Sequence, residues 1–171
     1  MRHVARGLAA ALALVTASVL ASAPPDSEVN PQTALIETVD AVLEGGLYKI
    51  RYTIKPNRGN VHYTEIISAP VADDLDPRVS IAPAGDTWVA WWRDLSPAQV
   101  LVRARSLGTQ SWFAERRVSE PGEISRNADI ALDGSKAWVA YEIAGAGGTS
   151  IAVTGGNSNE PWPTRSIIRL T

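Results

Sequence analysis

The sequence predicts an all-β protein made of tandem four-stranded antiparallel blades of the β-propeller type, with about two full blades and one partial blade in an incomplete ring. Short runs rich in Val, Ile, Trp, Tyr and Thr alternate in polarity and are separated by Gly, Pro, Asn and Asp. This alternation has the period of a strand, and no long segment keeps the period of a helix. Two tryptophan pairs also recur 50 residues apart, Trp88 with Trp138 and Trp112 with Trp162. Two independent markers with one period indicate an internal repeat of that length.

Each full copy of the repeat divides into four predicted strands. In the first copy they cover 78–82, 87–93, 99–105 and 112–118, and in the second 128–132, 137–143, 149–154 and 164–170. Gly, Asp, Ser and Asn stand between the strands, as hairpin turns require. Four strands in about fifty residues is the size of one propeller blade.

A weaker copy precedes these two, with predicted strands at 38–42, 48–54 and 62–68. We expect no first strand in this copy, because residues 24–32 ahead of it are polar and rich in proline, as linkers are. The predicted units are therefore a partial blade at 33–70 and full blades at 71–121 and 122–171.

The first 23 residues, 1–23, have the anatomy of a secretory signal peptide. Arg2 and Arg6 precede an apolar run at 8–20, and Ala21 and Ala23 supply the small side chains that signal peptidase accepts. The run is shorter than the roughly 20 apolar residues that a membrane span needs. We therefore expect cleavage after Ala23 and a secreted or periplasmic protein, with no membrane span in the mature chain.

The charge and the cysteine content narrow the function classes. The chain has 16 Lys and Arg against 18 Asp and Glu, and cleavage after residue 23 leaves 14 against 18, a formal net charge of −4. A mildly acidic surface of mixed sign argues against nucleic acid as a partner. The absence of cysteine excludes a disulfide framework and a thiolate metal site. We expect no cofactor.

The segments 79–91 and 128–141 each carry a first strand, a turn and a second strand that ends in Trp-Val-Ala-Trp or Trp-Val-Ala-Tyr. In this pattern they resemble the blades of sialidase-like propellers with BNR-type repeats. The Asp-box of that family, Ser-x-Asp-x-Gly-x-x-Trp, is not intact here, because Pro83 stands at the aspartate position and Gly134 lies one place early. The resemblance implies a propeller fold. It assigns no catalytic residue, because the arginine cluster, the Tyr/Glu pair and the acidic proton donor of the enzymes come from blades all round a ring.

The tryptophans that repeat are predicted to pack between blades, because both faces of a blade are covered by its neighbours. Trp92 does not repeat, since Glu142 is its counterpart 50 residues later. A flat indole ring suits the C–H bonds of a sugar, so Trp92 and Glu142 are candidate ligand-binding residues. Arg103 and Arg105 are the other two candidates, because with Arg116 and Arg117 they lie on adjacent predicted strands of one blade and can form a patch that binds a carboxylate. The alternative is that these charges protect an edge strand.

Asp73, Asp74 and Asp76 lie in the loop predicted to enter the first full blade. Carboxylates at alternating positions can converge on Ca²⁺. The glycine and the distal glutamate of an EF-hand loop are missing, so a solvated turn is the favoured interpretation and no metal is assigned.

These observations favour an exported non-catalytic binding module that presents loops to a carbohydrate or protein ligand. Two alternatives remain open. The chain is a fragment of a larger sialidase-like, glycan-active enzyme whose further C-terminal blades are missing, or it is a self-assembling structural module in which a homo-oligomer covers the open blade faces.

Overall fold

The computed structural model describes residues 25–158, 162 and 165–169, and every regular element within them is a strand. The N-terminal sheet consists of β1 (Asp26–Val29), β2 (Leu35–Glu44), β3 (Leu47–Pro56) and β4 (Tyr63–Ile66). The middle sheet consists of β5 (Asp74–Ile81), β6 (Thr87–Arg93), β7 (Gln99–Arg105) and β8 (Arg116–Arg117). The C-terminal sheet consists of β9 (Ile124–Asp133), β10 (Lys136–Gly145), β11 (Gly148–Gly156) and β12 (Ser166–Arg169).

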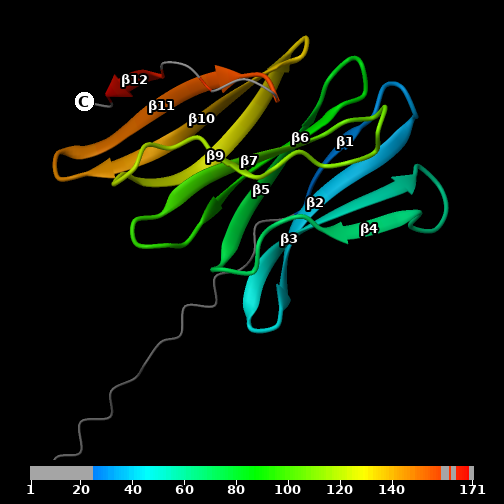
Figure 1. Ribbon diagram of the computed structural model, residues 1–171, viewed down its shortest axis with the longest axis horizontal. Coiled ribbons are helices and arrows are strands. Elements are labelled where there is room, and N and C mark those ends of the chain that lie inside the picture. Colours follow the sequence, from blue (N-terminus) through cyan, green and yellow to red (C-terminus); the bar gives the residue numbers. More distant parts are fainter. Residues whose placement is uncertain (1–24, 159–161, 163–164, 170–171) are drawn as a thin grey trace, which may run out of the picture.

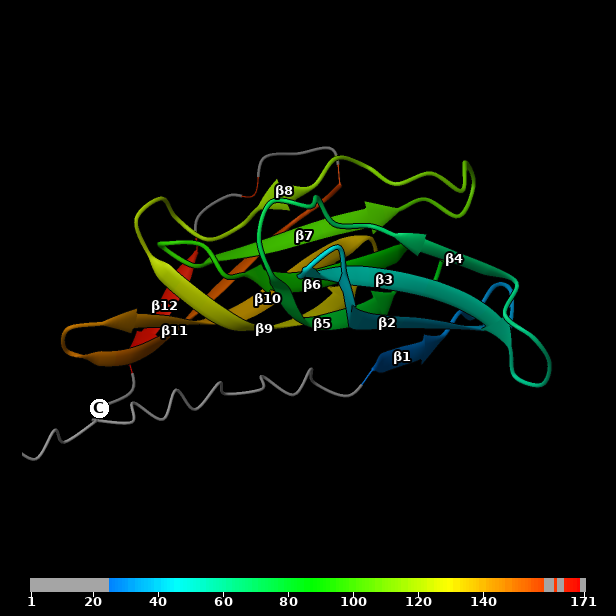
Figure 2. The same ribbon diagram turned by 90° about the horizontal axis from the view of Figure 1, so that it is seen from below.

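Each sheet is an antiparallel meander whose strands follow one another in chain order. The three sheets stack face to face like neighbouring blades, and they do not close into a ring (Figure 1, Figure 2). The first strands of the sheets contact one another, β1 with β5 and β5 with β9. The predicted fold class, an all-β propeller-type arrangement with an open ring, is therefore confirmed. Among the described residues no helix is long and apolar enough for a membrane crossing, and the predicted signal peptide at 1–23 lies outside them.

Two apolar clusters hold the stack together, one on each side of the middle sheet. Strand alternation sends Val89 and Trp91 of β6 toward the N-terminal sheet, where they pack on Tyr52. It sends Trp88 and Trp92 toward the C-terminal sheet. We call the face that a sheet turns to the preceding sheet its leading face, and the opposite face its trailing face. Tryptophans on both faces of the middle sheet are packing residues, as the repeat predicted for Trp88.

The N-terminal sheet has a first strand, so the prediction of a linker at 24–32 and of a three-stranded blade is wrong. β1 pairs with β2 over four residues. Its side chains also reach the free edge of β5, where Asp26 accepts a hydrogen bond from the Val79 amide at 2.8 Å and Glu28 accepts one from the Ile81 amide. Burial raises the pKa of the Glu28 carboxyl, which the Ile81 amide partly opposes. A short edge strand that uses carboxylates as acceptors is polar in sequence, and this is why it resembled a linker.

The boundaries of the middle sheet also differ from the prediction. β5 begins at Asp74, four residues before the predicted first strand, so the aspartates assigned to a loop lie at or inside this strand. The fourth strand was predicted over 112–118, but β8 covers only Arg116–Arg117, with one isolated bridge between Arg105 and Trp112. The intervening residues form a wall of the cleft described below.

The repeat extends to a shared β-bulge in the first strand. The pairing of β5 with β6 shifts between Leu75 and Arg78, and the pairing of β9 with β10 shifts between Ala140 and Glu142. Asp76 and Asn127 have positive φ angles of 48° and 51° at these points. Asp and Asn tolerate this left-handed conformation better than other side chains, so the residue type at the bulge follows from the backbone.

Candidate functional site

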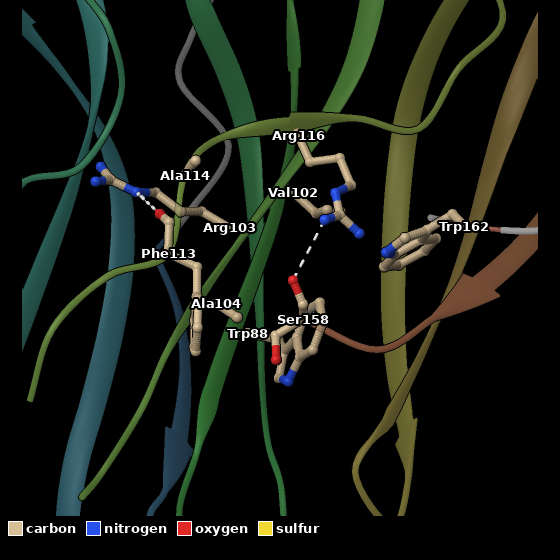
Figure 3. A pocket seen from close by; sticks show the side chains of 9 residues that line it. All are labelled: Trp88, Val102, Arg103, Ala104, Phe113, Ala114, Arg116, Ser158 and Trp162. Carbon is tan, nitrogen blue, oxygen red and sulfur yellow. Dashed lines mark hydrogen bonds between the residues drawn. The ribbon is translucent and has the colours of Figure 1, made fainter. Parts of the chain in front are cut away.

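A cleft lies between the middle and C-terminal sheets. It is at the rim of the sheets where the β5–β6 and β9–β10 turns come together. Its narrow part is lined by residues of β6, β7, β8, the β7–β8 connection and the segment after β11: Trp88, Val102, Arg103, Ala104, Phe113, Ala114, Arg116, Ser158 and Trp162 (Figure 3). It continues into a wider hollow of about 320 Å³, where Ala82, Asp86, Arg105, Ser135 and Asn157 join the lining. The hollow falls at the lower end of the size range of small-molecule sites.

Aromatic rings form the apolar part of the cleft. Trp88 and Trp162 lie with their ring centroids 6.0 Å apart at an interplanar angle of 55°. Gly156 makes room for Trp162, because a Cβ there would lie 2.7 Å from the indole. Trp88 is 4% exposed, whereas Phe113 is 37% exposed and is held by a hydrogen bond from its amide to the Ala104 carbonyl. Phe113 is therefore the most exposed of the aromatic side chains described around the cleft.

Polar groups face the same space. Arg116 donates to the carbonyl oxygens of Asn157 and Ser158 at 3.4 and 3.3 Å, which ties the segment after β11 to β8 (Figure 3). Asp86 accepts a hydrogen bond from the Leu107 amide at 2.8 Å. The Trp162 indole N–H is buried and has no hydrogen-bond acceptor within the described part of the chain. The cleft thus combines aromatic surface with a carboxylate, hydroxyls, an amide and a guanidinium.

The guanidinium groups of the two predicted arginines, Arg103 and Arg105, lie on the other side of the middle sheet. They belong to the leading face, and their side chains run toward the N-terminal sheet. Arg103 donates to the Phe113 carbonyl at 2.8 Å and to the Ile67 carbonyl, and its guanidinium lies 5.6 Å from the Trp112 ring centroid. Successive side chains of a strand point to opposite faces of the sheet. Ala104, which lies between the two arginines, therefore faces the cleft, and the arginines face away from it.

Arg105 is only 6% exposed, and its Nε has no hydrogen-bond partner among the described residues. Its guanidinium lies 5.7 Å from the Tyr52 ring centroid and 6.0 Å from that of Tyr63. Cation–π attraction offsets part of the cost of burying this charge. The predicted carboxylate-binding patch is replaced by a packing contact between two sheets.

Trp92 and Glu142 lie near the opposite ends of their strands from the cleft, and each pairs with a bulge residue. The Trp92 indole donates to Asp76 at 2.9 Å, and Glu142 accepts a hydrogen bond from Asn127 at 2.8 Å. Trp92 is 6% exposed and offers no open ring face. Trp92 and Glu142 differ between the two repeats, and their bulge partners differ with them. Asp76 accepts a hydrogen bond from Trp92, whereas Asn127 donates one to Glu142. The structure does not bring the four predicted binding residues together.

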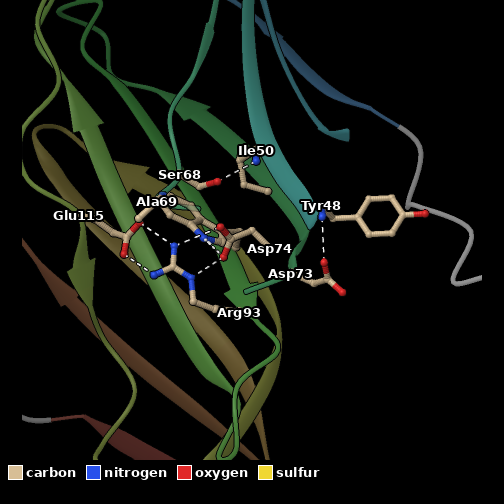
Figure 4. A network of polar contacts seen from close by, with 9 residues as sticks. Tyr48, Ile50, Ser68, Ala69, Asp73, Asp74, Arg93 and Glu115 are labelled. Atoms are coloured by element: carbon tan, nitrogen blue, oxygen red, sulfur yellow. Dashed lines mark hydrogen bonds and ion pairs between the residues drawn. The ribbon is translucent and has the colours of Figure 1, made fainter. Parts of the chain in front are cut away.

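The three aspartates also have separate partners, and Figure 4 shows those of Asp73 and Asp74. Asp73 accepts a hydrogen bond from the Tyr48 amide at 2.8 Å, and Asp76 accepts the one from Trp92. Asp74 is fully buried and pairs with Arg93 at 2.7 Å. In the described part of the chain no group of three or more His, Cys, Asp or Glu side chains is arranged to hold a metal ion.

Arg93 joins Asp74 to Glu115 in a network that pins the β4–β5 connection (Figure 4). Its Nη1 lies 2.7 Å from a Glu115 oxygen, and Glu115 accepts a long hydrogen bond from the Ala69 amide. Burial raises the pKa of the Asp74 carboxyl, although hydrogen bonds from Arg93 and Ser68 lower it. Burial lowers the pKa of Arg93, but its two carboxylate partners outweigh this and leave the value above normal. The network ties the β4–β5 connection to the middle sheet.

Phe113, Asp86 and Ser158 were not identified from the sequence. Phe113 is the single phenylalanine of the chain and directly follows the repeated Trp112, which was the available signal. Asp86 and Ser158 lie in turns with no repeated feature. These side chains meet only because two blades pack together.

Comparisons with known proteins support the fold. No protein-family model matches the chain, and no curated protein matches it. Among solved structures, the chain is similar to an alpha-L-arabinanase of Penicillium chrysogenum complexed with arabinobiose, with a TM-score of 0.60 and 10% sequence identity. The match covers 84% of this chain and 48% of that chain, so the chain spans about half the length of the arabinanase. At this identity the similarity shows a propeller-like fold and nothing finer.

Proposed function

We propose that this chain is an exported, non-catalytic carbohydrate-binding module whose ligand lies in the cleft between the middle and C-terminal sheets. The observation that carries the proposal is the accessible ring of Phe113 beside the polar side chains of a hollow of about 320 Å³. A sugar presents C–H bonds on its ring faces and hydroxyl groups around its edge. The aromatic ring suits the C–H bonds, and Asp86 and Ser135 offer acceptors and a donor for the hydroxyls.

The structural neighbour adds support from another direction. It is an arabinanase holding arabinobiose, so sheets arranged in this way are compatible with a sugar ligand. Arabinobiose is therefore the first ligand to test.

The non-catalytic part of the proposal rests on the acidic groups. Glycoside hydrolysis uses two carboxyl groups on either side of the bond that breaks. Of the residues described around the cleft, Asp86 is the one carboxylate, and it is bound to the Leu107 amide. A bound oligosaccharide is expected to remain intact.

Export rests on the predicted signal peptide. Expression in a bacterial host with its secretion machinery is expected to yield a mature protein that begins at Pro24, since cleavage is predicted after Ala23. Intact-mass measurement of the secreted protein checks this result. A protein that keeps residues 1–23 contradicts it.

The Phe113→Ala variant tests the cleft. We expect the affinity for arabinobiose, or for the best ligand in an oligosaccharide panel, to fall roughly tenfold by calorimetry, because the reachable aromatic surface is lost. Trp138→Ala is the matched control, since Trp138 is 40% exposed and lies on another surface. Equal affinity of Phe113→Ala and the wild type excludes the cleft as the site, and no binding across the panel excludes a carbohydrate ligand.

A further inference from the structure

The trailing face of the C-terminal sheet is apolar, and no described element covers it. It lies at one end of the stack (Figure 1), and β10 makes its main contacts only with its own sheet neighbours β9 and β11 among the described elements. Trp138 on this face is 40% exposed and Ile168 is 57% exposed. Strand alternation and register place six apolar side chains there: Ala131, Trp138, Ala140, Ile151, Val153 and Ile168.

The repeat shows that this surface is built like a packing face. Trp88 and Trp138 occupy the same position on the second strands of consecutive sheets, and both lie on trailing faces. Trp88 is 4% exposed because the C-terminal sheet covers it, with Trp162 against its ring. Trp138 lies close over Gly155, where a Cβ would come within 2.5 Å of the indole. The difference in exposure between equivalent tryptophans arises because a sheet covers Trp88, whereas no described element covers Trp138.

The other open face of the molecule has a different chemistry. The leading face of the N-terminal sheet carries an ion pair between Asp40 and Arg51, and Thr38, Thr53 and Lys55 lie around it. Stacking this face on Trp138 of another molecule would desolvate the ion pair against apolar side chains, which is unfavourable. A head-to-tail ring of copies is therefore disfavoured.

We propose that a second copy of this chain covers the surface, so that two C-terminal sheets pack with their trailing faces together in a two-fold symmetric dimer. Such an interface uses the same patch on both copies, and it places apolar surface against apolar surface. The proposal is independent of the carbohydrate ligand.

Charges of both signs lie on the patch. Lys136 stands at one end of β10, 3.9 Å above the Trp138 ring, and Asp133 is directly opposite it on β9, while Asp129 and Glu142 lie toward the other end of the same face. Because neither end of the patch is purely basic, these charges do not select between the two possible two-fold orientations of the sheets.

The size of the patch predicts a weak dimer. A strand of ten residues at about 3.3 Å per residue, in a sheet of four strands about 4.8 Å apart, covers roughly 500 Å² per copy. The total of roughly 1,000 Å² is at the lower limit for a specific interface. We expect a dimer that dissociates on dilution in the micromolar range.

Sedimentation equilibrium of the mature chain over a wide concentration range tests the dimer. The wild type is expected to pass from monomer to dimer and no further. In the Trp138→Glu variant the dissociation constant is expected to rise at least thirtyfold, because a central aromatic anchor becomes a charge. Lys55→Glu on the leading face and Phe113→Ala in the cleft are expected to dimerise like the wild type, and circular dichroism confirms that each variant is folded.

A wild type that stays monomeric, a Trp138→Glu variant that dimerises like the wild type, or growth into larger oligomers that Lys55→Glu abolishes would overturn the proposal.

Discussion

Replacing Arg93 with methionine is expected to lower the free energy of unfolding by about 3–5 kcal/mol, because removal of one partner from a buried ion pair leaves the others uncompensated. Arg93 is 5% exposed and pairs with the fully buried Asp74 and with Glu115. Asp74 also accepts a hydrogen bond from the Trp91 indole at 3.0 Å, so it cannot turn toward water without breaking a second contact. Urea unfolding of the mature chain measures the loss.

Two matched variants separate this effect from a general loss of charge. Arg58→Met removes an exposed arginine in the β3–β4 connection and is expected to change stability by less than about 0.5 kcal/mol. Arg93→Met combined with Asp74→Asn is expected to recover part of the loss, because no uncompensated aspartate remains in the interior. An Arg93→Met protein as stable as the wild type would show that the network contributes nothing.

The Arg93→Met deficit should also depend on pH. The folded pKa of Asp74 already lies above its ordinary value because of burial, and loss of the Arg93 hydrogen bonds raises it further. A carboxyl whose folded pKa exceeds its unfolded pKa favours the folded state when protonated, and this stabilisation is lost as the pH rises through the folded pKa. The deficit relative to the wild type is therefore expected to be large at neutral pH and smaller in mild acid.

Replacing Glu37 with leucine is expected to cost about 3–5 kcal/mol, because three buried donors lose their acceptor. Glu37 is 2% exposed and accepts hydrogen bonds from Asn30, Tyr52 and Thr87, which join the N-terminal sheet to the middle sheet. Burial raises the pKa of the Tyr52 phenol, and its hydrogen bond to Glu37 raises it further, so Tyr52 stays a donor.

Glu37→Gln is the informative companion variant, because it keeps the shape and one acceptor oxygen while removing the charge. We expect it to lose about 1–2 kcal/mol, less than Glu37→Leu. The exposed Glu44→Gln is the control and is expected to match the wild type. Thermal and urea unfolding measure all three, and a Glu37→Leu protein within about 1 kcal/mol of the wild type contradicts the role assigned to the network.

Glu37 also shows why the N-terminal blade was harder to recognise than the others. It occupies the second-strand position that Trp88 and Trp138 occupy in the following sheets, facing the next sheet. A buried acceptor with three donors replaces a tryptophan there, so the aromatic marker of the repeat is lost while the packing position is kept. β1 was missed for a similar reason, since its carboxylates bind the edge of β5 and give the strand a polar sequence.

The candidate site was less predictable than the fold. Arg103 and Arg105 were predicted on a strand, and they lie on β7, but the side of the sheet to which they point depends on how the blades are stacked. Trp92 breaks the repeat because its indole donates a hydrogen bond to the bulge residue Asp76, a pairing that the sequence alone does not reveal. The cleft is formed largely by turns and by the β7–β8 connection. Such irregular segments have no hydrophobic period from which a structure can be predicted.

The sequence by itself determined that the chain is all-β and that blades follow a period of about fifty residues, because strand alternation and repeated tryptophans are local properties of the chain. Only the tertiary structure decided which faces are covered. Trp88 and Trp138 are equivalent in sequence, yet one is buried and the other open, because burial depends on whether a neighbouring sheet is present. For the same physical reason, the cleft beside Phe113 exists only where two blades meet.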